Sequence, residues 1–400
     1  MAFDVARIRG LFPALGDGWV HFDAPAGMQV PEQVAAAVST ALRAPVSRPG
    51  GAFPASQRVE AIVEAARRAI ADLVGAEPAG VVLGPNVPVM LQRLADALGS
   101  TWLIGDEVTV SRLDHQANIA PWLRASQRPG AAVRWAEIDI ETCELPSWQY
   151  DNLISNRTKV VAVTAASGAV GTRPEVRKIA DVAHQEGALV VVDASAAAPF
   201  MPLDMAELGA DVMALSATAW GGPAVGALVF ADPSLLDQLP PCALDTSSRG
   251  ALRLELGPHA YPLLAGLIAS VDYLALLDDA ATGNRRERLR TSLSSAKSYQ
   301  AGLLAKLVSE LRALRHVTVI GDAMRRIPVL AFTVEGVKAA DAMVHLANYG
   351  VCAFADDVPS GVFSVLGVSE VGGAVRVGLA HYTTAGEVDL LADALADLRT

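Results

Sequence analysis

Lysine is scarce in this chain. Five lysines occur among the 32 basic residues, so arginine supplies most of the positive charge. Acidic residues outnumber basic ones, and the formal net charge is −11. This balance argues against non-specific nucleic-acid binding, because a phosphate backbone needs a basic surface; we expect no nucleic-acid partner. The five lysines are Lys159, Lys178, Lys297, Lys306 and Lys338.

Cysteine and long apolar runs are also few. The three cysteines, Cys143, Cys242 and Cys352, lie far apart and form neither a disulfide framework nor a CxxC metal site. No apolar run reaches the roughly 18 residues of a membrane span. The first residues, MAFDVARIRGLFPAL, lack the pattern of a signal peptide. We therefore expect a cytoplasmic protein with no metal site and no membrane partner.

Short β-branched runs alternate with helical patterns in the first two thirds of the chain. Such alternation is typical of βαβ units and predicts an α/β fold with a mostly parallel sheet. The run ALVVVDAS has no polar alternation before its aspartate, as expected for a strand covered on both faces. The predicted strands are 79–84, 107–111, 131–138, 158–167, 188–195 and 211–217, followed by an apolar strand that ends at Phe230.

The pattern changes after Gly257, where two long helical segments precede three short strands and a final helix. This change predicts a second, smaller α+β domain. We assign residues 19–260 to the large domain, and residues 1–18 together with 261–400 to the small one. Cys352 falls in a predicted strand, where it reads as a core residue.

Several chemically capable residues come directly after predicted strands, where open α/β sheets bind their ligands. Asp193, His115 and Ser216 are of this kind, and Arg376 lies in the strand AVRVGLA. Each also has a structural interpretation. A carboxylate at a strand end often caps the next segment, a single histidine is usually a hydrogen-bonded structural residue, and an arginine is usually an ion-pair partner.

The order of these residues resembles the class V aminotransferase family, most closely its cysteine-desulfurase-like branch. The stretch DEVTVSRLDHQANIAPW is similar to the family's acid-His-x-Ala-Asn-x-x-Pro-Trp pattern. Other matching stretches run collinearly over nearly the whole chain, among them VHFDAPAGMQVPEQV, ASGAVGTRPEVRKIADVAHQEGALVVVDASAAAP, LSATAWGGPAVGALVF and VRVGLAHYTTAGEVDLLADAL.

This resemblance implies fold type I of the pyridoxal 5′-phosphate (PLP) enzymes, with a mixed, mostly parallel seven-stranded sheet, a small C-terminal domain and a homodimer. In the family, a lysine forms a Schiff base with PLP, an aspartate pairs with the pyridine nitrogen and an imidazole stacks on the ring. The resemblance assigns the pyridine partner to Asp193, ring stacking to His115, substrate-carboxylate binding to Arg376, and cofactor contacts to Ser216, Thr218 and the turn Gly84, Pro85 and Asn86.

The family pattern is broken at the positions that contact PLP most directly. Ala219 stands where the Schiff-base lysine is expected, and Thr218 replaces the preceding histidine. Gly168, Ala196 and Pro258 replace polar side chains of the family, and residues 354–368 lack the desulfurase's mobile cysteine. None of the five lysines is expected near Asp193: Lys159 is predicted to precede its strand at the far end, and the others lie on outward-facing helices or in the small domain.

Two hypotheses follow. The chain is either a non-catalytic homologue that binds PLP or another small anionic metabolite without a covalent bond, or an active PLP-dependent aminotransferase or lyase of a small amino acid in which Ala219 is engineered or functionally replaced. We favour the first, because one engineered substitution does not account for the other departures. Within it, the sequence does not separate PLP from another anion.

Overall fold

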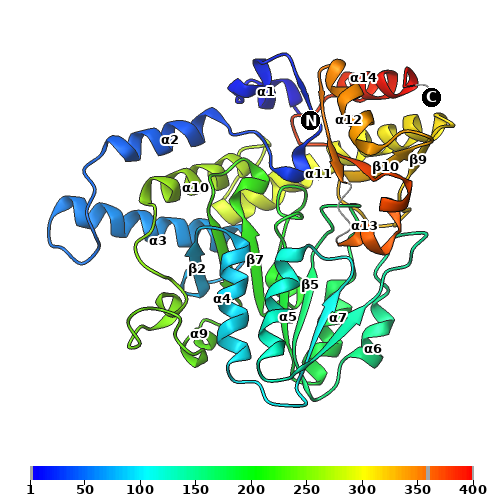
Figure 1. The fold of residues 1–400 in the computed structure, drawn as a ribbon. Coiled ribbons are helices and arrows are strands. Elements are labelled where there is room, and N and C mark those ends of the chain that lie inside the picture. Colours follow the sequence, from blue (N-terminus) through cyan, green and yellow to red (C-terminus); the bar gives the residue numbers. More distant parts are fainter. Residues whose placement is uncertain (1–2, 357–360, 399–400) are drawn as a thin grey trace.

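A computed structural model describes residues 3–356 and 361–398 (Figure 1). Its central element is a seven-stranded sheet in the order β2-β8-β7-β6-β5-β3-β4. Only β8 runs opposite to the other six strands, so the predicted mixed, mostly parallel sheet is confirmed. The strands are β2 (Val81–Gly84), β3 (Glu107–Ser111), β4 (Ala132–Ala136), β5 (Thr158–Thr164), β6 (Leu189–Asp193), β7 (Val212–Ser216) and β8 (Gly226–Phe230).

Helices cover both faces of this sheet because alternate strand residues point to opposite sides. In β5, Val160 and Ala162 face one buried cluster, and Val161 and Val163 face the other. Helices α4 (Val87–Gly99) and α5 (Ala120–Gln127) contribute to the first cluster. The second is completed by α3 (Pro54–Val74), α7 (Val176–Gln185), α10 (Tyr261–Leu274) and the first half of α11 (Arg285–Ala313).

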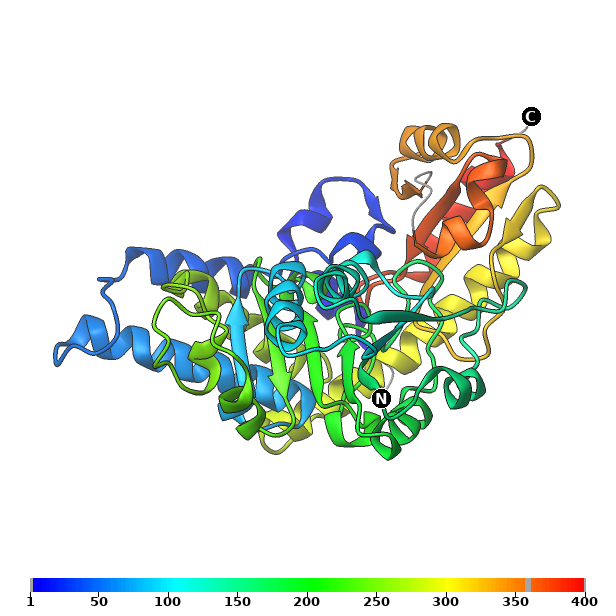
Figure 2. The ribbon, with the colours of Figure 1, turned by 60° about the horizontal axis from the view of Figure 1, so that its bottom comes forward.

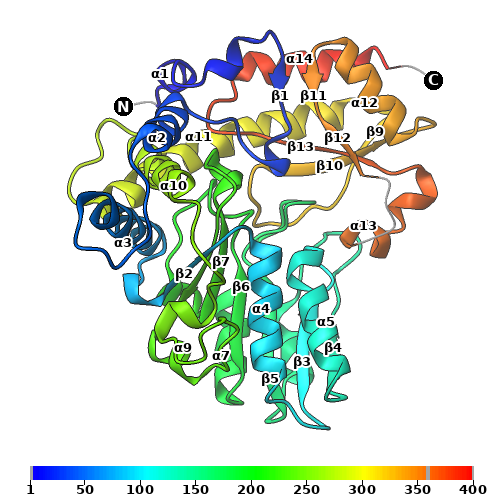
Figure 3. The ribbon, with the colours of Figure 1, turned by 60° about the vertical axis from the view of Figure 1, so that its left-hand side comes forward.

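A second, antiparallel sheet, in the order β12-β13-β10-β9, lies beyond one end of the large sheet (Figure 3). Its core includes Leu307, Phe332, Val377 and Leu391. The strands are β9 (Val317–Val319), β10 (Val329–Val334), β12 (Phe354–Asp356) and β13 (Ala374–Gly378), and helices α12 (Ala339–Asn348), α14 (Ala385–Ala396) and the second half of α11 pack against them. The predicted smaller α+β part is therefore present, and its sheet is antiparallel.

The N-terminal segment runs along both parts of the molecule. β1 (Val20–His21) pairs in parallel with β11 (Val351–Cys352), which joins this segment to the C-terminal part. The following helix, α2 (Glu32–Arg43), packs on α10, and α2 and α3 extend together to one side of the molecule (Figures 1 and 2). The predicted boundary at residue 260 stays a prediction. The remaining short helices are α1 (Val5–Arg9), α6 (Tyr150–Leu153), α8 (Met205–Leu208), α9 (Ser234–Gln238) and α13 (Val362–Val365).

Two local expectations differ from the structure. Lys159 is the second residue of β5 rather than a residue before it, because the strand begins at Thr158. Its ammonium group forms an ion pair with Asp106 at 3.3 Å. Cys352 lies in a strand as predicted, but it is only partly buried, since β11 is one half of a two-stranded pair near the surface. No helix within 3–356 or 361–398 is both long and apolar enough to cross a membrane.

A buried carboxylate joins α3 to the end of β2. Glu255 is 6% exposed and accepts two 2.9 Å hydrogen bonds from Arg67, one from the Leu83 amide at 2.8 Å and one from His259 at 3.0 Å. Desolvation alone would raise the pKa of Glu255, but these hydrogen bonds and the charge of Arg67 outweigh it, and the pKa is lowered. Glu255 is therefore held ionised.

We predict that Glu255→Gln lowers the free energy of unfolding by about 3 kcal/mol or more, because it leaves the Arg67 guanidinium buried without its counter-charge. Urea denaturation at pH 7 measures this change. Glu64→Gln is the control. Glu64 lies on α3, as Arg67 does, and its carboxylate pairs with Arg68 at the exposed surface. The effect of Glu64→Gln on the free energy of unfolding should stay below about 1 kcal/mol. Equal effects of the two substitutions would contradict the prediction.

Candidate functional site

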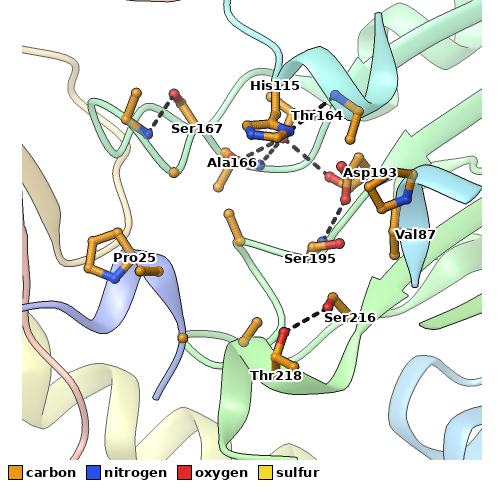
Figure 4. A pocket seen from close by; sticks show the side chains of 18 of the residues that line it. Pro25, Val87, His115, Thr164, Ala166, Ser167, Asp193, Ser195, Ser216 and Thr218 are labelled. Carbon is orange, nitrogen blue, oxygen red and sulfur yellow. Dashed lines mark hydrogen bonds between the residues drawn. The ribbon is translucent and has the colours of Figure 1, made fainter. Parts of the chain in front are cut away.

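A cavity, called the large cavity below, lies at the carboxyl edge of the parallel strands (Figure 4). It has a volume of about 400 Å³. Because β3, β5, β6 and β7 run in the same direction, the residues that follow them meet at one edge. The loop Pro25–Gly27 and Arg376 of β13 close the opposite side, so the cavity has walls from the large sheet, the N-terminal segment and the small sheet.

Asp193 ends β6 and lines the floor of this cavity. Its carboxylate accepts a 2.9 Å hydrogen bond from the Ser195 amide, and the residue is 6% exposed. No lysine or arginine of the described residues forms an ion pair with it. A buried carboxylate with no cationic partner is a favourable contact for a protonated ring nitrogen or another N–H donor of a ligand.

A second carboxyl group, Asp114, lies close to Asp193. It is buried, and accepts hydrogen bonds from the His115 amide at 3.0 Å and the Asn118 side chain at 2.9 Å. Desolvation, and then the negative charge of Asp193, raise the pKa of Asp114 well above its usual value. Burial beside a second carboxyl group therefore favours the protonated form of Asp114. Our sequence reasoning did not single it out, although it is the acid of the acid-His pattern.

His115 lines the cavity with an exposed ring while also serving as a helix cap. It precedes a short 3-10 helix (Gln116–Asn118), and its Nδ1 accepts the Ala117 amide at 3.1 Å. In the neutral ring the proton is therefore on Nε2. Figure 4 shows the imidazole on the same side of the cavity as Asp193, with Ser216 and Thr218 on the other side. The structure thus shows the capping role of this histidine, and ring stacking on a cofactor stays a prediction.

Ala219 lies beside these hydroxyl groups and lines the cavity with a methyl group. It belongs to the 3-10 turn Ala217–Trp220 that follows β7. The Ser216 and Thr218 hydroxyls hydrogen bond to each other at 2.9 Å. All five lysines are described by the structure, and none is among the lining residues. No side-chain amine of this chain is available at the cavity wall to form a Schiff base.

The turn before α4 offers few donors to a phosphate group. The Asn86 side chain caps α4 by accepting the Val89 amide at 3.0 Å, and Pro88 has no amide hydrogen. Of the first three residues of α4, only Val87 has a backbone N–H that is left to bind a ligand, because Pro88 has no N–H and the Val89 N–H donates to Asn86. Gly84 and Pro85 do not face the large cavity in the described chain; they line a neighbouring one of about 260 Å³, together with Glu255 and Pro258.

Arg376 lies in β13 and reaches the cavity, as the resemblance implied. Its guanidinium group is already engaged on two sides. Nε lies 2.8 Å from Asp356 Oδ2, and Nη1 donates to the carbonyl oxygen of Gly168 at 3.1 Å. A Cβ placed on Gly168 would lie 3.5 Å from the Cβ of Ala196, so two of the departures from the family pattern are neighbours. Neither Gly168 nor Ala196 offers a polar side chain to the cavity.

These residues fit PLP only in part. The Asp193 carboxylate and the His115 ring suit the pyridine ring. However, the cavity wall has no lysine for the aldehyde, and its one arginine is paired with Asp356. With few backbone donors at α4, a dianionic phosphate has little to balance its charge. The residues present therefore do not fit a covalently attached cofactor.

We predict a pH-dependent stability effect at Asp114. Above pH 4 the unfolded Asp114 ionises while the folded one stays protonated, so the wild type loses up to about 1.4 kcal/mol of stability per pH unit until the raised pKa is reached. Asp114→Asn removes this loss, and its stability relative to the wild type should rise between pH 5 and pH 7. Asp151→Asn, at an exposed position, is the control in the same denaturation series; a pH-independent difference for Asp114→Asn would contradict the prediction.

Comparison with known proteins agrees with this architecture. The family model "Aminotransferase class-V" matches residues 20–391. An uncharacterised protein of Mycobacterium tuberculosis is 52% identical over the full length of both chains, and an aminotransferase-like protein of Gibberella zeae is 30% identical over 98% of each. The crystal structure of the cysteine desulfurase CsdA of Escherichia coli superposes with a TM-score of 0.85 at 26% identity, covering 99% of this chain and 98% of that one. The chain belongs to the class V aminotransferase family and has the cysteine-desulfurase-like form of PLP fold type I.

Proposed function

We propose that this protein is a non-catalytic member of its family that binds a small metabolite non-covalently in the large cavity. The observation that carries the proposal is the wall at Ala219, where a methyl group lies and no lysine of the chain lines the cavity. PLP is the cofactor that the family implies. Without an amine at this wall, the residues of this chain can bind and orient a ligand but cannot hold it by a Schiff base.

The charges along the wall define the ligand that we propose. Asp193 offers a buried carboxylate to an N–H group, and Arg376 offers its remaining N–H groups to an anionic group. A partner with both features is an amino-acid-like or pyridine carboxylate, or free PLP. Apolar side chains, among them Pro25, Val87 and Leu113, contribute to the walls between these polar groups and favour the exclusion of water around a ring.

A second function remains supported by the retained residues. Asp193, His115 and Arg376 occupy the positions that the family uses for the pyridine nitrogen, the ring face and the substrate carboxylate. An active aminotransferase or lyase for a small amino acid would retain them and would obtain its amine from elsewhere. In that case Ala219 is a substitution or is functionally replaced.

We further propose a cytoplasmic homodimer. The described chain contains three free cysteines and no disulfide, which suits a reducing compartment. The end of α2 and its connection to α3 project from the molecule (Figure 2). Leu42 of α2, and Val46 and Phe53 of the connection, are each more than half accessible. Apolar side chains on a projecting segment favour burial against a second subunit.

Purification in the presence of PLP tests the absence of a Schiff base. We expect that borohydride fixes no PLP to any lysine, as judged by the absorbance spectrum and peptide mapping. Ala219→Lys is the matched variant: it supplies the amine, and it should give an aldimine band that is lost on dialysis because few donors bind the phosphate. A lysine-linked PLP in the wild type would contradict the proposal and support the second function.

The dimer is tested by analytical ultracentrifugation. We expect the wild type to sediment as a dimer, and the double variant Val46→Glu/Phe53→Glu to sediment as a monomer, since it places two carboxylates in an apolar interface. Ile104→Glu is the control, because Ile104 is 90% exposed on a different loop. A monomeric wild type, or a double variant that remains dimeric, would contradict this proposal.

A further inference from the structure

Three basic side chains surround a small cavity between the two sheets, outside the site described above. Arg173 follows the loop after β5, Arg326 precedes β10, and Lys297 comes from α11. Backbone pairing brings the first two together: the Arg173 amide donates to the carbonyl of Arg325 at 2.9 Å, and the Ile327 amide donates to that of Gly171 at 2.8 Å.

The cavity has about the size of one small oxyanion. Its volume is about 60 Å³, enough for a few water molecules or one tetrahedral group. Apolar side chains such as Phe200, Met201 and Leu304 form the rest of its wall. No carboxylate is among the described residues that line it.

The basic groups lack partners of their own. Nε of Arg173 and both Nε and Nη2 of Arg326 are buried without a hydrogen-bond partner in the described chain. The nearby carboxylates are engaged elsewhere, since Glu175 pairs with Arg325 and Lys178, and Asp322 pairs with Arg312. Buried donors without partners, on groups of the same charge, are costly unless an anion joins them.

The pKa values of these three groups are lowered, first by burial and then by neighbouring positive charges. Desolvation, followed by the charge of Arg325, lowers the pKa of Arg173. The pKa of Lys297 is lowered by desolvation and then by Arg173. For Arg326, desolvation is again the largest cause of a lowered pKa, although Asp322 opposes it. A bound anion would reverse these effects by restoring a counter-charge.

We propose that Arg173, Lys297 and Arg326 form a binding site for a phosphate group, taken up either as inorganic phosphate or as the terminal phosphate of a small metabolite. Two planar guanidinium groups and one ammonium group match the several oxygens of a tetrahedral oxyanion. The site is separate from the large cavity, and none of its three basic residues lines that cavity.

Thermal unfolding of the full-length protein in inorganic phosphate, in glycerol 3-phosphate and in chloride at equal ionic strength tests this site. At about ten times the dissociation constant, phosphate should raise the melting temperature by about 1.5 to 2 °C over chloride. An equal shift with glycerol 3-phosphate assigns the site to phosphorylated metabolites. A shift with inorganic phosphate alone assigns it to the free ion.

Variants locate the effect. Lys297→Met should raise the melting temperature in chloride, because it removes one of three like charges, and should weaken phosphate binding about tenfold or more. Arg315→Met, at an exposed position, removes the same charge and should leave the phosphate shift intact. Arg376→Met should also retain the shift. If Arg326→Met does not fold, Lys297→Met still decides the question, since Lys297 lies largely at the surface.

Two results would overturn the proposal. One is an equal melting temperature in phosphate and chloride for the wild type. The other is a phosphate shift that persists in Lys297→Met or disappears in Arg376→Met, which would place the anion in the large cavity. Neither result bears on the absence of a lysine-linked cofactor, so the two proposals fail independently.

Discussion

The parallel alignment of β3, β5, β6 and β7 is the constraint on which the other features depend. It brings His115, Asp193 and Ser216, which lie far apart in sequence, to one edge of a sheet. Both faces of this sheet are buried: Val161 of β5 belongs to one apolar cluster, and its neighbours Val160 and Ala162 belong to the other. The cavity is therefore a direct product of the fold and persists regardless of which side chain occupies position 219.

The electrostatics of the cavity differ from those of a site built to attach PLP. Asp114, whose pKa is raised by burial and by its neighbour Asp193, lies beside the cavity, and the only lining arginine of the described chain, Arg376, pairs with Asp356. Such a wall suits a ligand that brings its own proton donor. The cluster of Arg173, Lys297 and Arg326 is separate from this wall. These positive charges therefore do not lie where they could bind the phosphate of a cofactor in the large cavity.

The sequence predicted the order of strands and helices along the chain and the residues at the ends of the strands, because hydrophobic periodicity and family motifs are local signals. It did not predict the ion pair of Arg376 with Asp356, which depends on the pairing of β12 with β13. It also did not predict that the Asn86 side chain caps α4. The sequence predicts that Lys297 lies away from Asp193, and Lys297 does not line the large cavity. Its partners Arg173 and Arg326 come from separate segments, and only the backbone pairing around Gly171 shows that they meet.

That backbone pairing also limits how the molecule can move. Gly171 has a φ of 79°, and a Cβ there would lie 2.2 Å from the carbonyl oxygen of Val329. The two main chains are therefore in direct contact along this seam, where residues 171–173 pair with residues 325–327. Rigid-body separation on that side would break the backbone hydrogen bonds of 171–173 with 325–327. A hinge motion that opens the molecule at this seam would therefore have to break main-chain hydrogen bonds.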